Sequence, residues 1–130
     1  MKSFNAILKG KHVLIVEDDR ELGRVLARLV RHYGIRVTHA ESGPKALRLL
    51  KRELPDLVLL DLGLPNMSGL DVVIQVRRDE KAKTVPILAM SGNPTEERKC
   101  VRAGCNGFIL KPFDVSQLLQ KISQLLVSTD

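Results

Sequence analysis

The sequence predicts a doubly wound α/β domain, in which helices cover both faces of a five-stranded parallel sheet. Short apolar runs alternate along the chain with longer segments whose apolar residues recur at helical spacing, five times in succession. Most of the short runs are apolar throughout, and a strand that is apolar on both faces belongs inside a parallel sheet covered by helices. The 130 residues are enough for one such domain with its own core.

The clearest predicted strand is Leu57–Asp61, in which four apolar residues run directly into a carboxylate. Pro55 and Gly63 bound this run, and short apolar runs bounded in this way are typical of buried strands. The segment Ile35–Ala40 alternates apolar and polar residues, so we expect it at an edge of the sheet. The remaining predicted strands are Val13–Val16, Val85–Met90 and Gly107–Leu110.

Five helices are predicted between and after these strands. Asp19 can cap the first, Ser42 precedes the second with a proline in its first turn, and Asp114 can cap the last with Gln117 as its capping-box partner. The apolar stripes place the helices at residues 22–33, 44–54, 70–78, 95–102 and 115–126. We expect residues 1–11 to be a lead-in segment without a function, residues 12–127 to be the domain, and residues 128–130 to be a tail.

Composition argues against several classes of protein. No apolar run approaches the ~20 residues of a membrane-spanning helix, and the N-terminus lacks a signal-peptide stretch, so we expect a cytoplasmic protein without membrane contact. Cys100 and Cys105 are not spaced as a metal or redox pair, and free thiols are expected. Much of the net charge of +6 lies in the first two predicted helices. We interpret it as solvated helix faces, because an aromatic content of 3% does not favour nucleic-acid binding.

Charged and hydroxyl side chains stand where four of the predicted strands end. Glu17 and Asp18 follow the first strand, Asp61 ends the third, Ser91 follows the fourth and Lys111 follows the fifth. The ends of parallel strands share one edge of the sheet, where the ligands of open α/β sheets bind. Three carboxylates in a small space repel one another, and a hard cation with oxygen ligands, such as Mg²⁺, would neutralise them.

These groups are also the parts that phosphoryl transfer requires. Asp61 can act as a nucleophile and form an acyl phosphate, while a metal ion, a hydroxyl group and an ammonium group stabilise the phosphoryl oxygens. Taken singly, each residue has a simpler interpretation, since Asp18 or Ser91 could cap a helix and Lys111 could form one ion pair. Their joint occurrence at matched strand ends favours a shared site.

Four motifs carry a resemblance to a known family. They are the strand end Glu17-Asp18-Asp19, the segment from Asp61 to Gly69, the segment from Pro86 to Gly92, and Lys111-Pro112-Phe113. With these motifs in this order, residues 11–127 resemble the receiver domain of two-component response regulators, as in the single-domain chemotaxis regulators. The resemblance implies a flavodoxin-like fold with strand order 2-1-3-4-5 and five helices.

The resemblance implies a phosphoacceptor and a metal site. Asp61 would accept a phosphoryl group from a histidine kinase or a phosphotransfer domain. Glu17 and Asp18 would bind Mg²⁺ together with Asp61 and the backbone carbonyl of Gly63. Phosphoryl transfer to Asp61 in a phosphorelay would then depend on Mg²⁺.

The resemblance also implies a switch. Ser91 and Lys111 would contact the phosphoryl group, and Phe108 would turn inward as Ser91 is drawn toward it. The face made by the fourth helix, the fifth strand and the fifth helix would change shape, and an output protein would bind there. The Lys111–Pro112 peptide bond is expected to be cis. The segment from Ser91 to Gly104 is shorter than the family pattern implies, so we expect a short fourth helix.

Such a domain would be a signalling switch that catalyses only its own phosphorylation and dephosphorylation, and not an enzyme in the usual sense. One alternative is a pseudo-receiver that binds partners without phosphorylation, against which the complete set of Glu17, Asp18, Asp61, Ser91 and Lys111 argues. Another is a flavodoxin-like cofactor binder or a phosphatase. No glycine-rich phosphate loop follows the first strand, and no second aspartate stands two residues after Asp61, so both are disfavoured.

Overall fold

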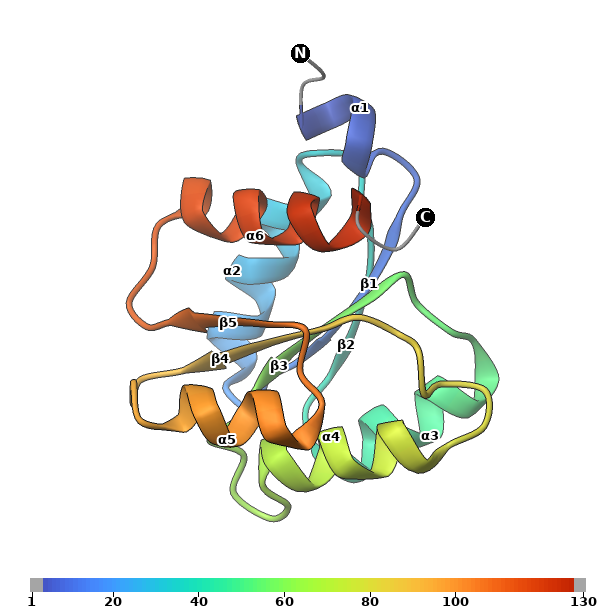
Figure 1. Cartoon of the computed structure of the whole chain (residues 1–130). Coiled ribbons are helices and arrows are strands. Elements are labelled where there is room, and N and C mark those ends of the chain that lie inside the picture. Colours follow the sequence, from blue (N-terminus) through green and yellow to red (C-terminus); the bar gives the residue numbers. More distant parts are fainter. Residues whose placement is uncertain (1–3, 128–130) are drawn as a thin grey trace.

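The computed structural model describes residues 4–127, in which five parallel strands form one sheet in the order β2-β1-β3-β4-β5 (Figure 1). The strand order and direction confirm the predicted fold, and β2 lies at an edge as its alternating pattern predicts. The expected tail, residues 128–130, lies outside the described residues. The strands are β1 (His12–Val16), β2 (Arg36–Ala40), β3 (Leu57–Asp61), β4 (Ile87–Ser91) and β5 (Gly107–Leu110).

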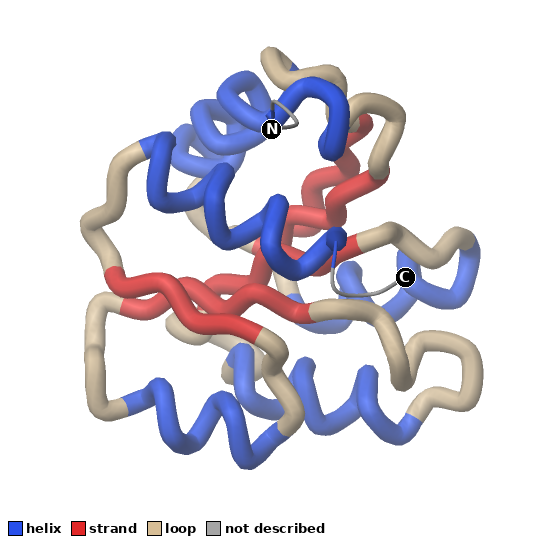
Figure 2. The backbone as a smooth tube through the Cα atoms, turned by 45° about the horizontal axis from the view of Figure 1, so that its top comes forward, coloured by secondary structure: helices blue, strands red, loops and turns tan. Residues whose placement is uncertain are grey.

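Helices cover both faces of the sheet (Figures 1 and 2). One face carries α3 (Gly43–Arg52), α4 (Gly69–Arg78) and α5 (Glu96–Ala103). The other carries α2 (Arg20–Arg31) and α6 (Val115–Val127), with α1 (Phe4–Leu8) packed against α6. None of these described helices is long and apolar enough to cross a membrane.

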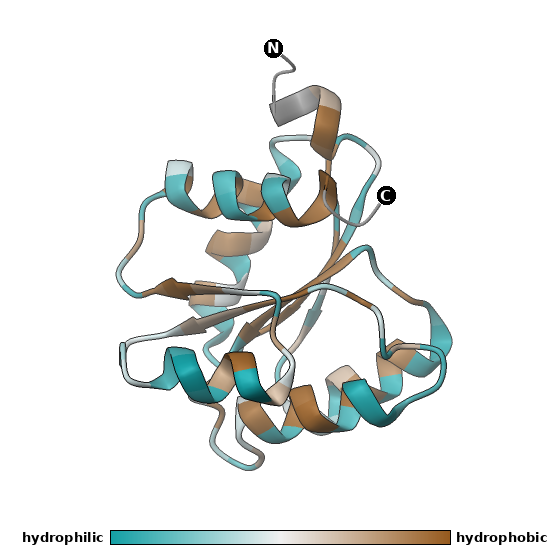
Figure 3. Ribbon diagram, in the orientation of Figure 1, coloured by the Kyte–Doolittle hydropathy of each residue, from teal (hydrophilic) through white to brown (hydrophobic). Residues whose placement is uncertain are grey.

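Each strand contributes to two separate apolar cores. Consecutive side chains of a strand point to opposite faces of the sheet. In β1, Leu14 and Val16 therefore pack with the residues of α3, α4 and α5, whereas Val13 and Ile15 pack with those of α2 and α6. Figure 3 shows the resulting pattern, with hydrophobic strands at the centre and hydrophilic segments on the outer surfaces of the helices. The continuous apolar run of each central strand is thus explained by burial on both faces.

The predicted helix caps are present. The carboxylate of Asp19 accepts hydrogen bonds from the backbone N–H groups of Glu21 and Leu22, and the hydroxyl of Ser42 accepts one from Lys45. Before α6, the N–H of Gln117 donates to Asp114 Oδ1 at 2.8 Å, and the side chain of Gln117 accepts from the N–H of Asp114 at 3.0 Å. The Lys111–Pro112 peptide bond is cis, as expected.

The expectation of five helices is wrong, because α1 precedes β1 and residues 4–127 contain six. Leu8, at the end of α1, is fully buried among apolar residues of α2 and α6. The backbone N–H of Gly10 then donates to the carbonyl of Gly34, so the segment before β1 is tied to the domain. A helix of five residues is too short to display helical periodicity, which is why the sequence pattern did not reveal it.

The expectation of free thiols is also wrong, because Cys100 and Cys105 form a disulfide. Cys100 lies in α5 and Cys105 just before β5, and their Cα atoms are 5.4 Å apart. Between them Gly104 has a φ of 120°, which reverses the chain at the end of α5 in a conformation that favours glycine. Sequence spacing alone does not indicate this reversal.

We predict that Leu8→Ala lowers the free energy of unfolding by about 2–4 kcal/mol, because it removes a fully buried side chain from a packed core. Chemical denaturation measures this change, and Lys9→Ala, which alters the exposed next residue, is the control. If the two variants were equally stable, α1 would contribute nothing to the domain.

Candidate functional site

The predicted site residues converge at the carboxyl edge of the sheet. Asp61 is the last residue of β3 and Ser91 the last residue of β4, while Glu17 and Lys111 directly follow β1 and β5. Parallel pairing aligns these ends, since Asp61 lies beside Met90 in the register of β3 with β4. The prediction that the four strand ends share one edge is therefore correct.

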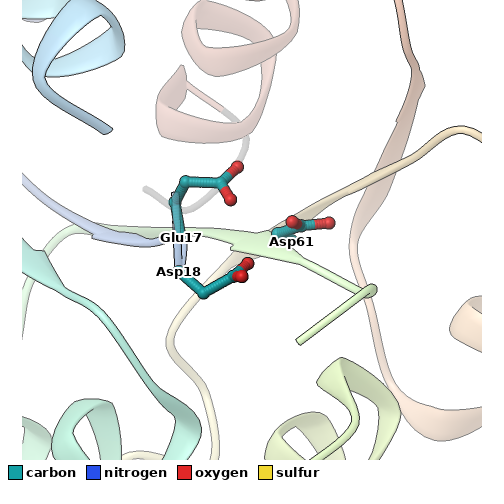
Figure 4. Close-up of side chains that lie close together, drawn as sticks. All are labelled: Glu17, Asp18 and Asp61. Atoms are coloured by element: carbon teal, nitrogen blue, oxygen red, sulfur yellow. The ribbon is translucent and has the colours of Figure 1, made fainter. Parts of the chain in front are cut away.

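Three carboxylates form the centre of this edge. One oxygen from each of Glu17, Asp18 and Asp61 lies within 4.8 Å of the others. Figure 4 shows the side chains of Glu17 and Asp18, from the end of β1, close to that of Asp61. Glu17 and Asp61 are buried, with 2% and 7% of their surfaces exposed, whereas Asp18 is exposed. Solvent can therefore reach the cluster on the side of Asp18.

Lys111 is the only cation that the described residues place within ion-pair distance of this cluster. Its Nζ lies 3.3 Å from Asp61 Oδ2 and 3.5 Å from Glu17 Oε1. Burial raises the pKa of Glu17 to about 7, and the negative charge of Asp61 adds to this effect. The N–H of Asp19 and the charge of Lys111 oppose it without cancelling it. One ammonium group therefore does not balance the acidic cluster.

Backbone groups hold Asp61 in place. The N–H of Gly63 donates to Asp61 Oδ1 at 3.0 Å, which leaves Oδ2 for Lys111. The first residue of α4, Gly69, lies directly against the chain that leaves β3. A Cβ atom at Gly69 would stand 2.7 Å from the carbonyl oxygen of Asp61, so only glycine allows α4 to begin this close to the strand. This contact fixes the loop that contains Gly63.

The hydroxyl of Ser91 forms its hydrogen bonds with residues outside the cluster of Glu17, Asp18 and Asp61. It donates to Glu96 Oε1 at 2.5 Å, and its oxygen accepts from the N–H of Asn93 at 3.0 Å. Glu96 lies in the first turn of α5. Glu96 is a site residue that the sequence motifs do not indicate, and the one available signal is its position shortly after the strand-end Ser91.

A second contact that the sequence does not predict involves the backbone of Glu17. Nε2 of His39, near the end of β2, is 2.8 Å from the backbone carbonyl oxygen of Glu17. The imidazole ring fills the space beside Gly23 of α2, where no Cβ atom could fit. His39 is the residue before the last one of β2. No sequence pattern indicates that His39 contacts the backbone of Glu17.

Phe108, the expected switch residue, lies in β5 and is 9% exposed. It packs in the core beneath α3, α4 and α5 and also lines a cavity of about 530 Å³. Glu97 of α5 and Gln120 of α6 line the same cavity. Phe108 thus contacts the face on which an output partner is expected, and its movement stays a prediction.

Comparisons with known proteins agree with this geometry. The family model of the response regulator receiver domain matches residues 13–123. The chain is 33% identical to chemotaxis protein CheY-3 of Vibrio cholerae over 120 residues, which cover 90% of this chain and 92% of that protein. It is also 32% identical to probable histidine kinase 6 of Oryza sativa subsp. japonica, over 95% of this chain, although it spans only 15% of that protein's length.

Solved structures share the fold. The receiver domain of sensor histidine kinase PA1611 from Pseudomonas aeruginosa, solved with a magnesium ion coordinated in its active site cleft, is similar with a TM-score of 0.82. The two chains are 32% identical, and the match covers 92% of this chain and 98% of the other. The family model spans most of the sequence and the sheet has the expected strand order, so this chain belongs to the response regulator receiver domains of two-component signalling systems.

Proposed function

We propose that this receiver domain accepts a phosphoryl group on Asp61 and that the modified domain switches the binding of an output protein. The observation that carries the proposal is the pairing of Asp61 with Lys111, 3.3 Å apart, inside a cluster of three carboxylates at an accessible edge of the sheet. A buried nucleophile beside a fixed ammonium group is suited to phosphoryl transfer, which depends mainly on positioning and on charge stabilisation.

The chemistry uses few groups of the protein. A carboxylate oxygen of Asp61 attacks the phosphorus of a phosphohistidine, the P–N bond breaks, and the imidazole nitrogen keeps the electron pair and takes up a proton. Lys111 stabilises the charge on the phosphoryl oxygens. Water later attacks the same phosphorus, the bond to Asp61 breaks, and the carboxylate and inorganic phosphate are released. The domain is therefore a switch that resets itself.

The residues present fit a Mg²⁺ ion. Glu17, Asp18 and Asp61 offer hard oxygen ligands, the first and last are buried, and Lys111 leaves negative charge uncompensated. We assign the ion to these three carboxylates and to the backbone carbonyl of Gly63. When bound, it would supply the positive charge that an additional phosphoryl group requires. The magnesium described for the PA1611 receiver domain supports this assignment.

The donor would be a histidine kinase or a phosphotransfer protein. Beside Lys111, an apolar cavity of about 480 Å³ lies between α2 and the start of α6, lined by Val25, Pro112 and Phe113 among others. Val25 is 49% exposed, and this apolar surface next to the acidic edge offers a donor protein a place to dock. The face of α5, β5 and α6 would bind the output protein.

A cytoplasmic location, without nucleic-acid or membrane partners, remains our expectation. The Cys100–Cys105 disulfide is unusual for that compartment, where thiols are normally kept reduced.

The first prediction is that the protein gains one phosphoryl group when it is incubated with a small acyl phosphate and Mg²⁺, as measured by intact mass. Asp61→Asn removes the nucleophile and abolishes the gain, and a chelator of Mg²⁺ prevents it. Asp71→Asn, which alters an exposed aspartate of α4, is the matched control and retains the gain. Folded wild-type protein that stays unmodified would favour the pseudo-receiver alternative.

A second prediction concerns pH. The folded pKa of Glu17, about 7, lies above its ordinary value of 4.5, so the folded state binds this proton more tightly than the unfolded chain does. In metal-free buffer, the stability that this proton provides is complete below the unfolded pKa and is lost as pH rises from 4.5 to about 7.

Mg²⁺ should raise the melting temperature more at about pH 8 than at about pH 5, because it binds the deprotonated carboxylates. Glu17→Gln, which mimics the protonated side chain, should flatten the metal-free profile in this range. Identical pH profiles for the wild type and this variant would show that Glu17 titrates normally.

The third prediction from this proposal is that Lys111→Met slows phosphorylation by roughly 100-fold, because it removes the charge that stabilises the phosphoryl oxygens but keeps an unbranched side chain of similar size. The rate is measured by intact mass over time, and Lys45→Met, at an exposed position of α3, is the control. Circular dichroism checks that both variants are folded. An unchanged rate in folded Lys111→Met protein would remove Lys111 from the phosphorylation step.

A further inference from the structure

The hydrogen bond between Ser91 and Glu96 joins the phosphoacceptor edge to α5. Ser91 is 4% exposed, and its hydroxyl donates to Glu96 Oε1 at 2.5 Å. Glu96 is half-buried and stands in the first turn of α5. Only Gly92, Asn93, Pro94 and Thr95 separate the two residues, so the short connection brings the first turn of the helix within reach of the strand end.

A serine hydroxyl has a single hydrogen to donate. While Ser91 donates it to Glu96, it cannot donate it to a phosphoryl oxygen on Asp61. Its oxygen also accepts from the N–H of Asn93, at 3.0 Å, so the hydroxyl is held from both sides. The contact that Ser91 is expected to make in the phosphorylated domain therefore requires the bond to Glu96 to break.

We propose that Glu96 is a positioning residue that holds the Ser91 hydroxyl in the unphosphorylated arrangement and thereby slows phosphorylation. This inference rests on the proposed phosphorylation of Asp61. A hydrogen bond to a carboxylate is stronger than one between neutral groups, so it competes effectively with the incoming phosphoryl oxygens. Because Glu96 is only half-buried, water can solvate its carboxylate once Ser91 leaves, and the contact can break and reform.

The N-cap residue of α5 differs from those of α2, α3 and α4. Thr95, at the N-cap, makes no side-chain hydrogen bond to the helix, in contrast to Asp19, Ser42 and Ser68 at the starts of α2, α3 and α4. The Ser91–Glu96 bond instead links the first turn of α5 to the end of β4. Its loss would remove this side-chain link and leave the backbone hydrogen bond from the N–H of Glu96 to the carbonyl of Asn93.

The test compares rates of phosphorylation by a small acyl phosphate with Mg²⁺, followed by intact mass. Glu96→Gln weakens the bond without changing the size of the side chain, and Glu96→Asp shortens the side chain while keeping its charge. Both should accelerate phosphorylation on the order of three- to tenfold. This range is expected when a charged hydrogen bond is weakened in the unphosphorylated domain and is absent from the transition state.

Two controls separate the hydrogen bond from other effects. Lys99→Gln removes an exposed charge from the same helix and should leave the rate unchanged. In a Ser91→Ala background, Glu96→Gln should have no effect, because the bond is already absent. A purely structural role of Glu96 would not depend on Ser91.

The outcomes are distinct. Acceleration by both Glu96 variants that disappears in the Ser91→Ala background supports the inference. Equal acceleration with and without Ser91 would mean that the charge of Glu96 merely repels the anionic donor, and an unchanged rate in both variants would mean that the bond does not resist phosphorylation. Either result overturns the inference while the proposed function stands. Wild-type protein that takes up no phosphate would instead overturn the proposed function, and this inference with it.

Discussion

The charge imbalance at the carboxyl edge of the sheet is the constraint on which the site depends. Two buried carboxylates and an exposed one share a single ammonium group, and burial raises the pKa of one of them to about 7. A fold can retain such a cluster when a cation binds there, since unpaired buried charges are strongly unfavourable. The apolar packing of the sheet on both faces holds the carboxylates close together despite their repulsion.

The fold and most of the site could be predicted because they depend on local patterns. Strands that are apolar on both faces indicate a parallel sheet, and a parallel sheet brings every strand end to one edge. This rule predicts that Asp61, Glu17 and Lys111 lie together, and they do. The caps at Asp19, Ser42 and Asp114 were predicted for the same reason, because a cap is read from a few adjacent residues.

The features that the sequence does not predict depend on tertiary contacts between segments. α1 is too short to show helical periodicity, and Leu8 is buried only because α1 packs against α6. The disulfide requires the reversal at Gly104, and the Ser91–Glu96 bond requires the course of the loop after β4. His39 reaches the carbonyl of Glu17 because Gly23 leaves room for its ring. Each of these contacts joins segments whose relative placement no local pattern encodes.

The two attachments of α5 differ in kind. Its C-terminal half is joined to the segment before β5 by the Cys100–Cys105 disulfide, whereas side-chain and backbone hydrogen bonds hold its N-terminal turn near the end of β4. Because the disulfide restrains the C-terminal half of α5, we expect any displacement of this helix to be larger at its N-terminal turn, where Glu97 borders the cavity beside Phe108.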